Sequence, residues 1–265
     1  MEPQDKSGSP TRLGKRRQPK VTRDAILKAA SYEFAMEGLA GARMDAIAQS
    51  AGVNKALLYY YFHDKDALYG AVLDQFFRPL FERLTKVLDR PASPGERILS
   101  YARMHFDTIA AAPHYARLFQ GEMMSAGRDM SPYLSEIVER YARPLFLRLQ
   151  ATFTQGVESG QFRQIDVMQA IPSTVATVVF YFVGAPVLRR LGGFEPFSSE
   201  SIRNRRAAVL DFIAGALFAD RESGLRLAAE IAAKAELPET SLSPVALPHH
   251  RVAAQRTKER SSHES

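Results

Sequence analysis

The stretch from residue 42 to residue 65 constrains the fold of this chain more than any other. Apolar residues recur in it at positions i, i+3, i+4 and i+7, namely Met44, Ile47, Ala48 and Ala51. This spacing places them on one stripe of a short helix. Gly52 follows directly and can take the left-handed conformation in which helices often end. The pattern therefore predicts a short helix that stops at a tight turn.

A second helix is predicted directly after that turn. Asn54 is a good N-cap for it, because an Asn side chain can accept a hydrogen bond from the first free backbone N–H groups. Leu58, Tyr61 and Phe62 lie at i, i+3 and i+4, so they can pack inward onto the preceding helix. We expect a compact three-helix head whose helix-turn-helix motif spans about residues 43–62.

A helix-turn-helix sets its second helix into the major groove of DNA, so the outward side chains of that helix are candidates for contacts with bases and phosphates. They are, with the cap residue included, Asn54, Lys55, Ala56, Leu57, Tyr59 and Tyr60. Three consecutive tyrosines could instead be packing residues of a small helical domain. We accept that interpretation for Tyr61 only.

Lys65 is a candidate phosphate contact at the start of the following helix. Asp64 is expected to cap that helix, and the ammonium group of Lys65 and the free backbone N–H groups could both hold a phosphate there. Such a contact would position the protein without reading sequence. For Lys55 and Lys65 the alternative is a solvated surface charge.

These residues resemble the amino-terminal domain of the TetR/AcrR (tetracycline-repressor-like) family of bacterial regulators. The matching segments, which cover about residues 21–80, are Ile26 to Ala30 with Phe34 and Gly38, Asp45 to Ala48, Ala51 to Lys55, Leu58 to Phe62, and Lys65 with Leu68. The resemblance implies an all-α protein, with a DNA-binding head at 21–80 ahead of a larger helical domain for dimerisation and effector binding at 81–236. It also assigns a phosphate hydrogen bond to Tyr59.

The chain departs from the family pattern where the first helix of the motif begins. The family commonly has Thr or Ser there, and this chain has Ala42 and Arg43. A hydroxyl cap worth about 1 kcal/mol is therefore missing. Arg43 could instead contact a phosphate. Leu57 also takes a place often held by a small polar residue, so it could touch a thymine methyl group.

Positive charge is concentrated ahead of the head. Residues 1–24 hold seven Lys and Arg against three Asp and Glu, within a chain of net charge +6. We interpret residues 1–20 as a flexible basic arm that follows the DNA backbone or enters the minor groove, with Arg12, Arg16 and Arg17 as its candidate contacts. The alternative is an unstructured, solubilising leader.

The rest of the chain is predicted to be helical. Pro and Gly breaks leave helices near 65–89, 96–111, 114–126, 132–156, 166–190, 199–221 and 225–236, and no run alternates as a strand would. Residues 237–265 contain Pro238, Pro244 and Pro248, and we interpret them as a flexible tail. An apolar content of 46% excludes global disorder.

We expect a cytoplasmic protein without a membrane span. The first 24 residues are polar and lack the apolar region of a secretory signal. The most apolar run, Val175 to Leu188, is shorter than the roughly 20 residues that a span needs, and Gly184 and Pro186 interrupt it. The chain has no Cys, so disulfides and thiolate chemistry are excluded.

A homodimer is expected from the segments 166–190 and 199–221. Their apolar residues are more than one terminal helix pair can easily hide, so two pairs could form a four-helix seam. They are Val175, Val178, Val179, Phe182, Val187, Leu191, Val209, Leu210, Phe212, Ile213, Leu217 and Phe218. The alternative is that these helices bury all of them inside one subunit.

An effector pocket would draw on aromatic and Met side chains, so we expect a largely apolar small-molecule effector. The candidates for its lining are Met104, Phe106, Phe119, Met123, Tyr133, Phe146 and Phe180. Residues of these types at helical spacing often belong to the plain core instead. The polar residues Arg103, His105, Asp107, His114 and Glu122 could orient a ligand or lie on the surface.

We expect no metal site and no cofactor. His105, Asp107 and His114 could converge from neighbouring helices, but their spacing is not a recognised ligand pattern. The sequence also contains no phosphate-cradling Gly motif, no nucleophile elbow and no paired-carboxylate signature, so we expect no enzyme.

The leading functional hypothesis is a dimeric repressor that binds a palindromic double-stranded DNA operator and is released by a small-molecule effector. A second hypothesis is a sequence-tolerant architectural DNA-binding protein that is held mainly by its arm. A third is an enzyme or transport module that carries a helical head.

Overall fold

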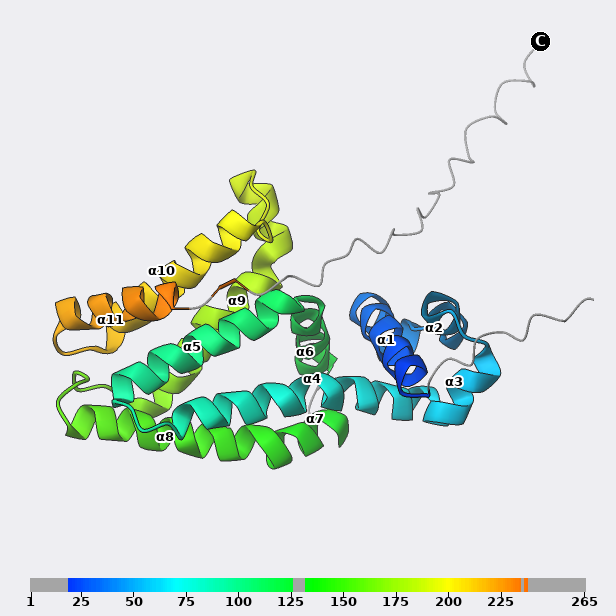
Figure 1. Ribbon diagram of the computed structural model, residues 1–265, viewed down its shortest axis with the longest axis horizontal. Coiled ribbons are helices and arrows are strands. Elements are labelled where there is room, and N and C mark those ends of the chain that lie inside the picture. The colour runs from blue at the N-terminus through cyan, green and yellow to red at the C-terminus, as the bar shows by residue number, and fades with distance from the viewer. Residues whose placement is uncertain (1–18, 126–131, 235, 238–265) are drawn as a thin grey trace, which may run out of the picture.

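The computed structural model describes residues 19–125, 132–234 and 236–237, and these fold into helices (Figure 1). The prediction of an all-α chain is confirmed. The helices are α1 (Pro19–Gly41), α2 (Met44–Ala51), α3 (Lys55–Phe62), α4 (Lys65–Leu88), α5 (Pro94–Ala111), α6 (His114–Ser125), α7 (Pro132–Ile137), the π-helical turn η1 (Val138–Ala142), α8 (Arg143–Glu158), α9 (Val167–Gly192), α10 (Ser199–Leu217) and α11 (Arg221–Ala233). The candidate arm residues Arg12, Arg16 and Arg17, and the tail from residue 238, lie outside the described residues.

Local capping fixes the ends of the short helices of the head. The Asn54 side chain accepts a hydrogen bond from the backbone N–H of Leu57 at 2.7 Å, and Asp64 accepts one from Ala67 at 2.7 Å. Gly52 ends α2 in the left-handed conformation, with φ at 64°. Because these interactions lie within a few residues of one another, the sequence predicted all three, and they are confirmed.

The head consists of α1, α2, α3 and the beginning of α4, which lie together at one end of the molecule (Figure 1). Ile26, Ile47, Leu58 and Leu68 come from these four helices, and each is fully buried. Near its end α1 is broken at Gly38, whose φ of 68° few residues other than Gly tolerate. The chain thereby turns from α1 into α2.

The long helix α4 leaves the head and runs along the body beside α5 and α8, while α6 stands between the body and α1 (Figure 1). The buried side chains Val72, Leu73, Phe77 and Leu84 of α4 continue the core of the head into the body. The head and body therefore share one continuous helix.

Two helices of the body differ from the sequence-based prediction. The predicted helix 132–156 is divided into α7, η1 and α8. The predicted helix 199–221 ends at Leu217, because Phe218 is extended and forms an isolated bridge with Phe162. Asp220 then caps α11 by accepting hydrogen bonds from the backbone N–H groups of Glu222 and Ser223.

Helix α9 corrects the expectation that the apolar run is too short to span a membrane. It has 26 residues and is long and apolar enough to do so by length and composition alone. The apolar run is only part of this helix, which was predicted near 166–190 and continues through Pro172 and Pro186 from the capping side chain of Asp166. In this structure α9 packs against α5, α6, α8 and α10, so it is a helix of the folded body.

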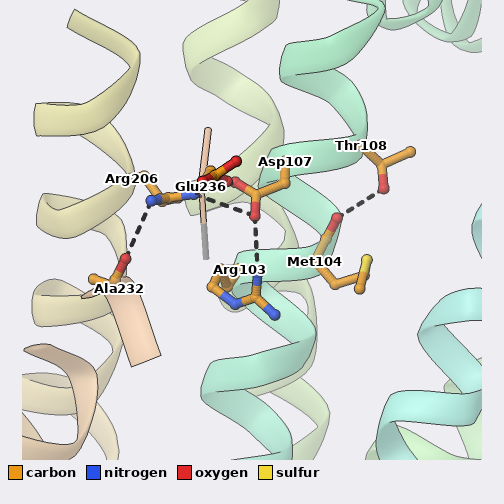
Figure 2. A network of polar contacts seen from close by, with 7 residues as sticks. All are labelled: Arg103, Met104, Asp107, Thr108, Arg206, Ala232 and Glu236. Carbon is orange, nitrogen blue, oxygen red and sulfur yellow. Dashed lines mark hydrogen bonds and ion pairs between the residues drawn. The ribbon is translucent and has the colours of Figure 1, made fainter. Parts of the chain in front are cut away.

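A buried ion pair fastens the last helices to the body (Figure 2). Arg206 of α10 is 5% exposed and lies 3.2 Å from Asp107 of α5, which also pairs with Arg103 at 3.1 Å. Arg206 further donates hydrogen bonds to the backbone carbonyls of Ala232 and Glu236. One guanidinium group therefore joins α5, α10 and the end of α11.

Candidate nucleic-acid interface and apolar cavity

Helix α3 turns one face into the head and the other outward. Leu58 and Phe62 are buried, whereas Tyr60 is 79% and Tyr59 is 39% exposed. Lys55 and Ala56 are exposed, and Leu57 and Tyr61 are half-buried. The exposed face belongs to a single helix, and a single helix is an element that a major groove admits.

Lys55 begins α3 with its charge already paired. Its Nζ lies 2.8 Å from a carboxylate oxygen of Asp45 in α2, and both side chains are more than half exposed. The hydrogen bond to Asp45 raises the pKa of Lys55, so the ammonium group stays charged. An ion pair this exposed to solvent is screened and contributes little to stability, so a phosphate can compete for the lysine.

Arg43 stands at the N-cap of α2 with an exposed side chain. The side chain makes no capping hydrogen bond, which confirms that the cap is missing. The backbone N–H of Arg43 donates instead to a carboxylate oxygen of Glu33 in α1, at 3.1 Å. The guanidinium group is therefore not required for the local fold.

Lys65 has a role in the head that the sequence did not indicate. Its Nζ donates to the backbone carbonyls of Ala40 at 3.1 Å and Ala42 at 3.4 Å, and the residue is half-buried. These carbonyls belong to the end of α1 and the link to α2. The ammonium group thus holds α4 against that link, and a surface-charge interpretation does not fit its position. No local signal reveals this contact, because the partners lie more than twenty residues away.

The head itself is electrically balanced. Residues 19–72 contain six Lys and Arg and six Asp and Glu. Long-range attraction to a polyanion would therefore depend on the basic residues that precede α1.

The body contains a partly open, apolar cavity of about 240 Å³ between α4, α5, α6, α8 and α9. Aromatic and aliphatic side chains make most of its wall, and among the described residues that line it none carries a charge at neutral pH. The polar groups in the wall belong to Tyr101, His105 and Tyr115. Burial lowers the pKa of His105 to about 4, so its imidazole is neutral at pH 7.

Two of the seven candidate lining residues border this cavity, Phe119 and Phe146. The other five predicted residues lie outside this cavity. Phe106 is fully buried against Phe182, and Met123 and Phe180 are 57% and 69% exposed. Tyr133 makes a hydrogen bond with Asp66 in the groove beside α4, and Met104 is half-buried outside the cavity. Residue type and helical spacing could not separate these positions, because the difference depends on which face of each helix meets its neighbours.

The three residues weighed as metal ligands face three different neighbours. His105 lies in the cavity wall, Asp107 pairs with Arg103 and Arg206, and His114 lies 3.2 Å from the Ser31 hydroxyl of α1. Within the described part of the chain, no group of three or more His, Cys, Asp or Glu side chains could hold a metal ion.

Helix α6 joins the cavity to the head. The His114 ring stacks on Tyr32 of α1 with centroids 4.2 Å apart, and Tyr115 beside it lines the cavity. Near the other end of α6, buried Glu122 accepts a hydrogen bond from the Tyr69 hydroxyl of α4 at 2.6 Å. Burial, with this bond, raises the pKa of Tyr69, so its hydroxyl stays protonated as the donor.

Apolar side chains on α9 and α10 reach solvent. Phe180, Val187, Leu191 and Phe212 are each at least 60% exposed. Val187, Leu191 and Phe212 were predicted for a dimer seam, and Phe180 was not. Seven further seam candidates are buried within the subunit, namely Val178, Phe182, Val209, Leu210, Ile213, Leu217 and Phe218. One subunit therefore hides only part of the predicted apolar surface.

Two family models match this chain. The model described as bacterial regulatory proteins, tetR family, covers residues 26–72, and the model described as tetracyclin repressor-like, C-terminal domain, covers residues 94–213.

Individual proteins match over most of their lengths. The chain is 30% identical to the HTH-type transcriptional regulator RutR of Escherichia coli K12 over 78% of this chain and 97% of that protein. It is 34% identical to the HTH-type transcriptional repressor SCO4008 of Streptomyces coelicolor over 59% of this chain and 73% of that protein. Among solved structures, the regulator FadR of Bacillus subtilis in complex with stearoyl-CoA matches with a TM-score of 0.55 at 19% identity, covering 73% of this chain and 98% of that one.

Proposed function

Since the chain belongs to the TetR family of bacterial regulatory proteins, we propose that it is a dimeric, sequence-specific repressor that a small molecule releases from a palindromic operator. Members of this family are helix-turn-helix transcription regulators and not enzymes, so the enzyme hypothesis is set aside. The cytoplasm, where bacterial DNA lies, is the compartment in which such a protein would act.

The observation that carries the proposal is the outward face of α3. Tyr60 is 79% exposed although burial of an aromatic ring is favourable. Lys55 and Ala56 beside it are exposed too. Tyr60 and Ala56 would meet base edges, and Lys55, Leu57 and Tyr59 would meet the rim of the groove. Asn54 would contribute as the cap that orients α3.

Phosphate contacts would surround this helix. Arg43 has an exposed guanidinium group that the fold does not use, and Lys65 could reach a phosphate while it retains one of its two carbonyl partners. Arg16 and Arg17 would add the positive charge that the balanced head lacks.

Dimerisation through α9 and α10 would cover the exposed apolar side chains. Phe180, Leu191 and Phe212 leave a hydrophobic surface that a second copy of the same face can bury by twofold symmetry. Two heads would then meet half-sites about 34 Å apart, or a multiple of that distance.

Release would begin at the cavity. A molecule that fills the cavity would displace Tyr115. The adjacent His114 would then shift against Tyr32 of α1, on which its ring stacks. The effector would favour release only to the extent that it binds the released arrangement more tightly. The FadR complex is a precedent for ligand binding on this fold.

The decisive experiment selects genomic fragments that the purified protein retains and compares wild type with Tyr60→Ala and Lys55→Ala. A repressor should give a palindromic consensus that changes in Tyr60→Ala, whereas Lys55→Ala, which loses a contact at the rim of the groove, should weaken binding to all fragments alike. Met124→Ala, on an 80% exposed side chain of α6, is the matched control and should leave the consensus unchanged. Equal binding of selected and random fragments would instead favour the architectural protein.

A further inference from the structure

The effector cavity combines an uncharged wall with one incompletely satisfied polar side chain. His105 comes from α5, lines the cavity and is 8% exposed. Its Nδ1 is buried and has no hydrogen-bond partner among the described residues. Buried ring nitrogens are usually paired, and the cavity that the His105 ring lines offers room for a partner.

The other polar groups of the wall are less available. The Tyr115 side chain is hydrogen-bonded to Ser31 of α1. Tyr101 is more deeply buried than His105, at 2% against 8% exposed, with ring centroids 5.7 Å apart. A neutral imidazole offers one N–H donor and one acceptor nitrogen, so His105 can meet either kind of polar group.

The wall also sets the charge of the occupant. No charged side chain lines the cavity within the described part of the chain, and a buried charge without a partner is strongly unfavourable. Burial keeps His105 itself neutral by lowering its pKa to about 4, so it cannot serve as a cation for an anionic ligand at pH 7.

The volume sets the size of the occupant. A protein cavity of about 150 Å³ holds benzene, with its six carbons. In proportion, the 240 Å³ cavity holds about ten non-hydrogen atoms.

We propose that the cavity takes an uncharged, mostly apolar molecule of about ten non-hydrogen atoms with one hydrogen-bonding group, and that His105 recognises this group. This inference rests on the proposed function, in which the same cavity is the effector site.

The test uses three probes of similar size, 2-naphthol, 2-methylnaphthalene and 2-naphthoate, titrated calorimetrically into the full-length protein. Both uncharged probes should bind, and 2-naphthoate should bind at least about tenfold more weakly than 2-naphthol. In His105→Phe, the affinity ratio of 2-naphthol to 2-methylnaphthalene should fall about tenfold, because the hydroxyl loses its partner. His63→Phe is the matched control on an exposed histidine and should leave the ratio unchanged.

The proposal is overturned if neither uncharged probe binds, if 2-naphthoate binds most tightly, or if the ratio in His105→Phe stays within about twofold of wild type. Should His105→Phe fail to fold, the order of the three probes on the wild-type protein still decides whether the cavity prefers an uncharged molecule. Operator release is measured separately. Probes that bind as expected without releasing DNA would contradict the repressor mechanism alone, and release by a charged molecule in the cavity would contradict this inference alone.

Discussion

The ring of His114 stacks on the ring of Tyr32, with centroids 4.2 Å apart and planes inclined by 23°. The contact joins α6 of the body to α1 of the head, and the Ser31 hydroxyl lies 3.2 Å from the same imidazole. Because Tyr115 is the next residue and lines the cavity, one turn of α6 contacts both the cavity and the head.

Removing the Tyr32 ring should weaken the effect of a cavity ligand on DNA affinity and leave DNA binding itself unchanged. We expect Tyr32→Leu to bind operator within about twofold of wild type, while the loss of DNA affinity caused by saturating 2-naphthol shrinks about 3- to 10-fold. Fluorescence anisotropy of a labelled operator measures both quantities. Val21→Ala, on an exposed side chain of α1, is the control. Undiminished release in Tyr32→Leu would show that the stack does not carry the signal.

Acid should destabilise the protein through two buried histidines. Burial lowers the pKa of His105 and of His114 to about 4, against about 6.5 in an unfolded chain. Between these pH values the unfolded state binds more protons, so the free energy of unfolding falls as pH drops from 6.5 to 4. The two residues contribute up to about 3 kcal/mol each.

Urea unfolding at several pH values checks this dependence. His105→Phe should flatten the curve by about half, and His63→Phe should leave its shape unchanged, because His63 is exposed. A curve of the same steepness in His105→Phe would mean that other groups govern the acid sensitivity.

Lys65→Met should weaken binding to every DNA sequence alike. The variant keeps the apolar stem and loses the charge, so the log-log salt slope should shrink by about 1 unit if Lys65 meets a phosphate. Thermal unfolding should also shift downward, because the carbonyls of Ala40 and Ala42 lose their donor. A lower unfolding temperature with an unchanged salt slope would leave Lys65 with its role inside the head only.

The buried pair of Arg206 and Asp107 should be costly to break. Arg206→Met leaves the Asp107 carboxylate with only Arg103 and frees the carbonyls at the end of α11, so we expect a loss of about 3 to 5 kcal/mol in urea unfolding. Arg226→Met removes an exposed pair with Glu222 and should cost less than about 1 kcal/mol. Similar losses in the two variants would contradict the importance of burial here.

A charge on the exposed face of α10 should prevent dimerisation. Phe212 is 64% exposed, and Phe212→Glu would place a carboxylate in the proposed seam. We expect sedimentation equilibrium to report a monomer, and operator affinity to fall at least about tenfold. Met124→Glu, at an exposed apolar side chain of α6, should remain dimeric. A dimeric Phe212→Glu variant would place the interface elsewhere.

Local chemistry explains what the sequence predicted well. Asn54, Asp64 and Gly52 act within four residues of their partners, so the ends of α2, α3 and α4 could be inferred from residue type. The inward orientation of Leu58 and Phe62 followed from helical spacing in the same way.

Contacts between distant segments could not be inferred. The carbonyl partners of Lys65, the pairing of Lys55 with Asp45, and the contact of His114 with Tyr32 depend on how helices pack. The cavity shows the same limit, since Phe146 and Phe180 are both aromatic residues on long helices, yet one lines the cavity and the other faces solvent.

The continuous course of α4 turns small displacements into large ones. A helix of 24 residues is about 36 Å long, so a tilt of about 5° at its cavity end moves its other end by about 3 Å. That distance is close to the rise of about 3.4 Å between stacked base pairs. A small tilt of α4 within the body could thus shift the head along DNA by almost one base-pair step.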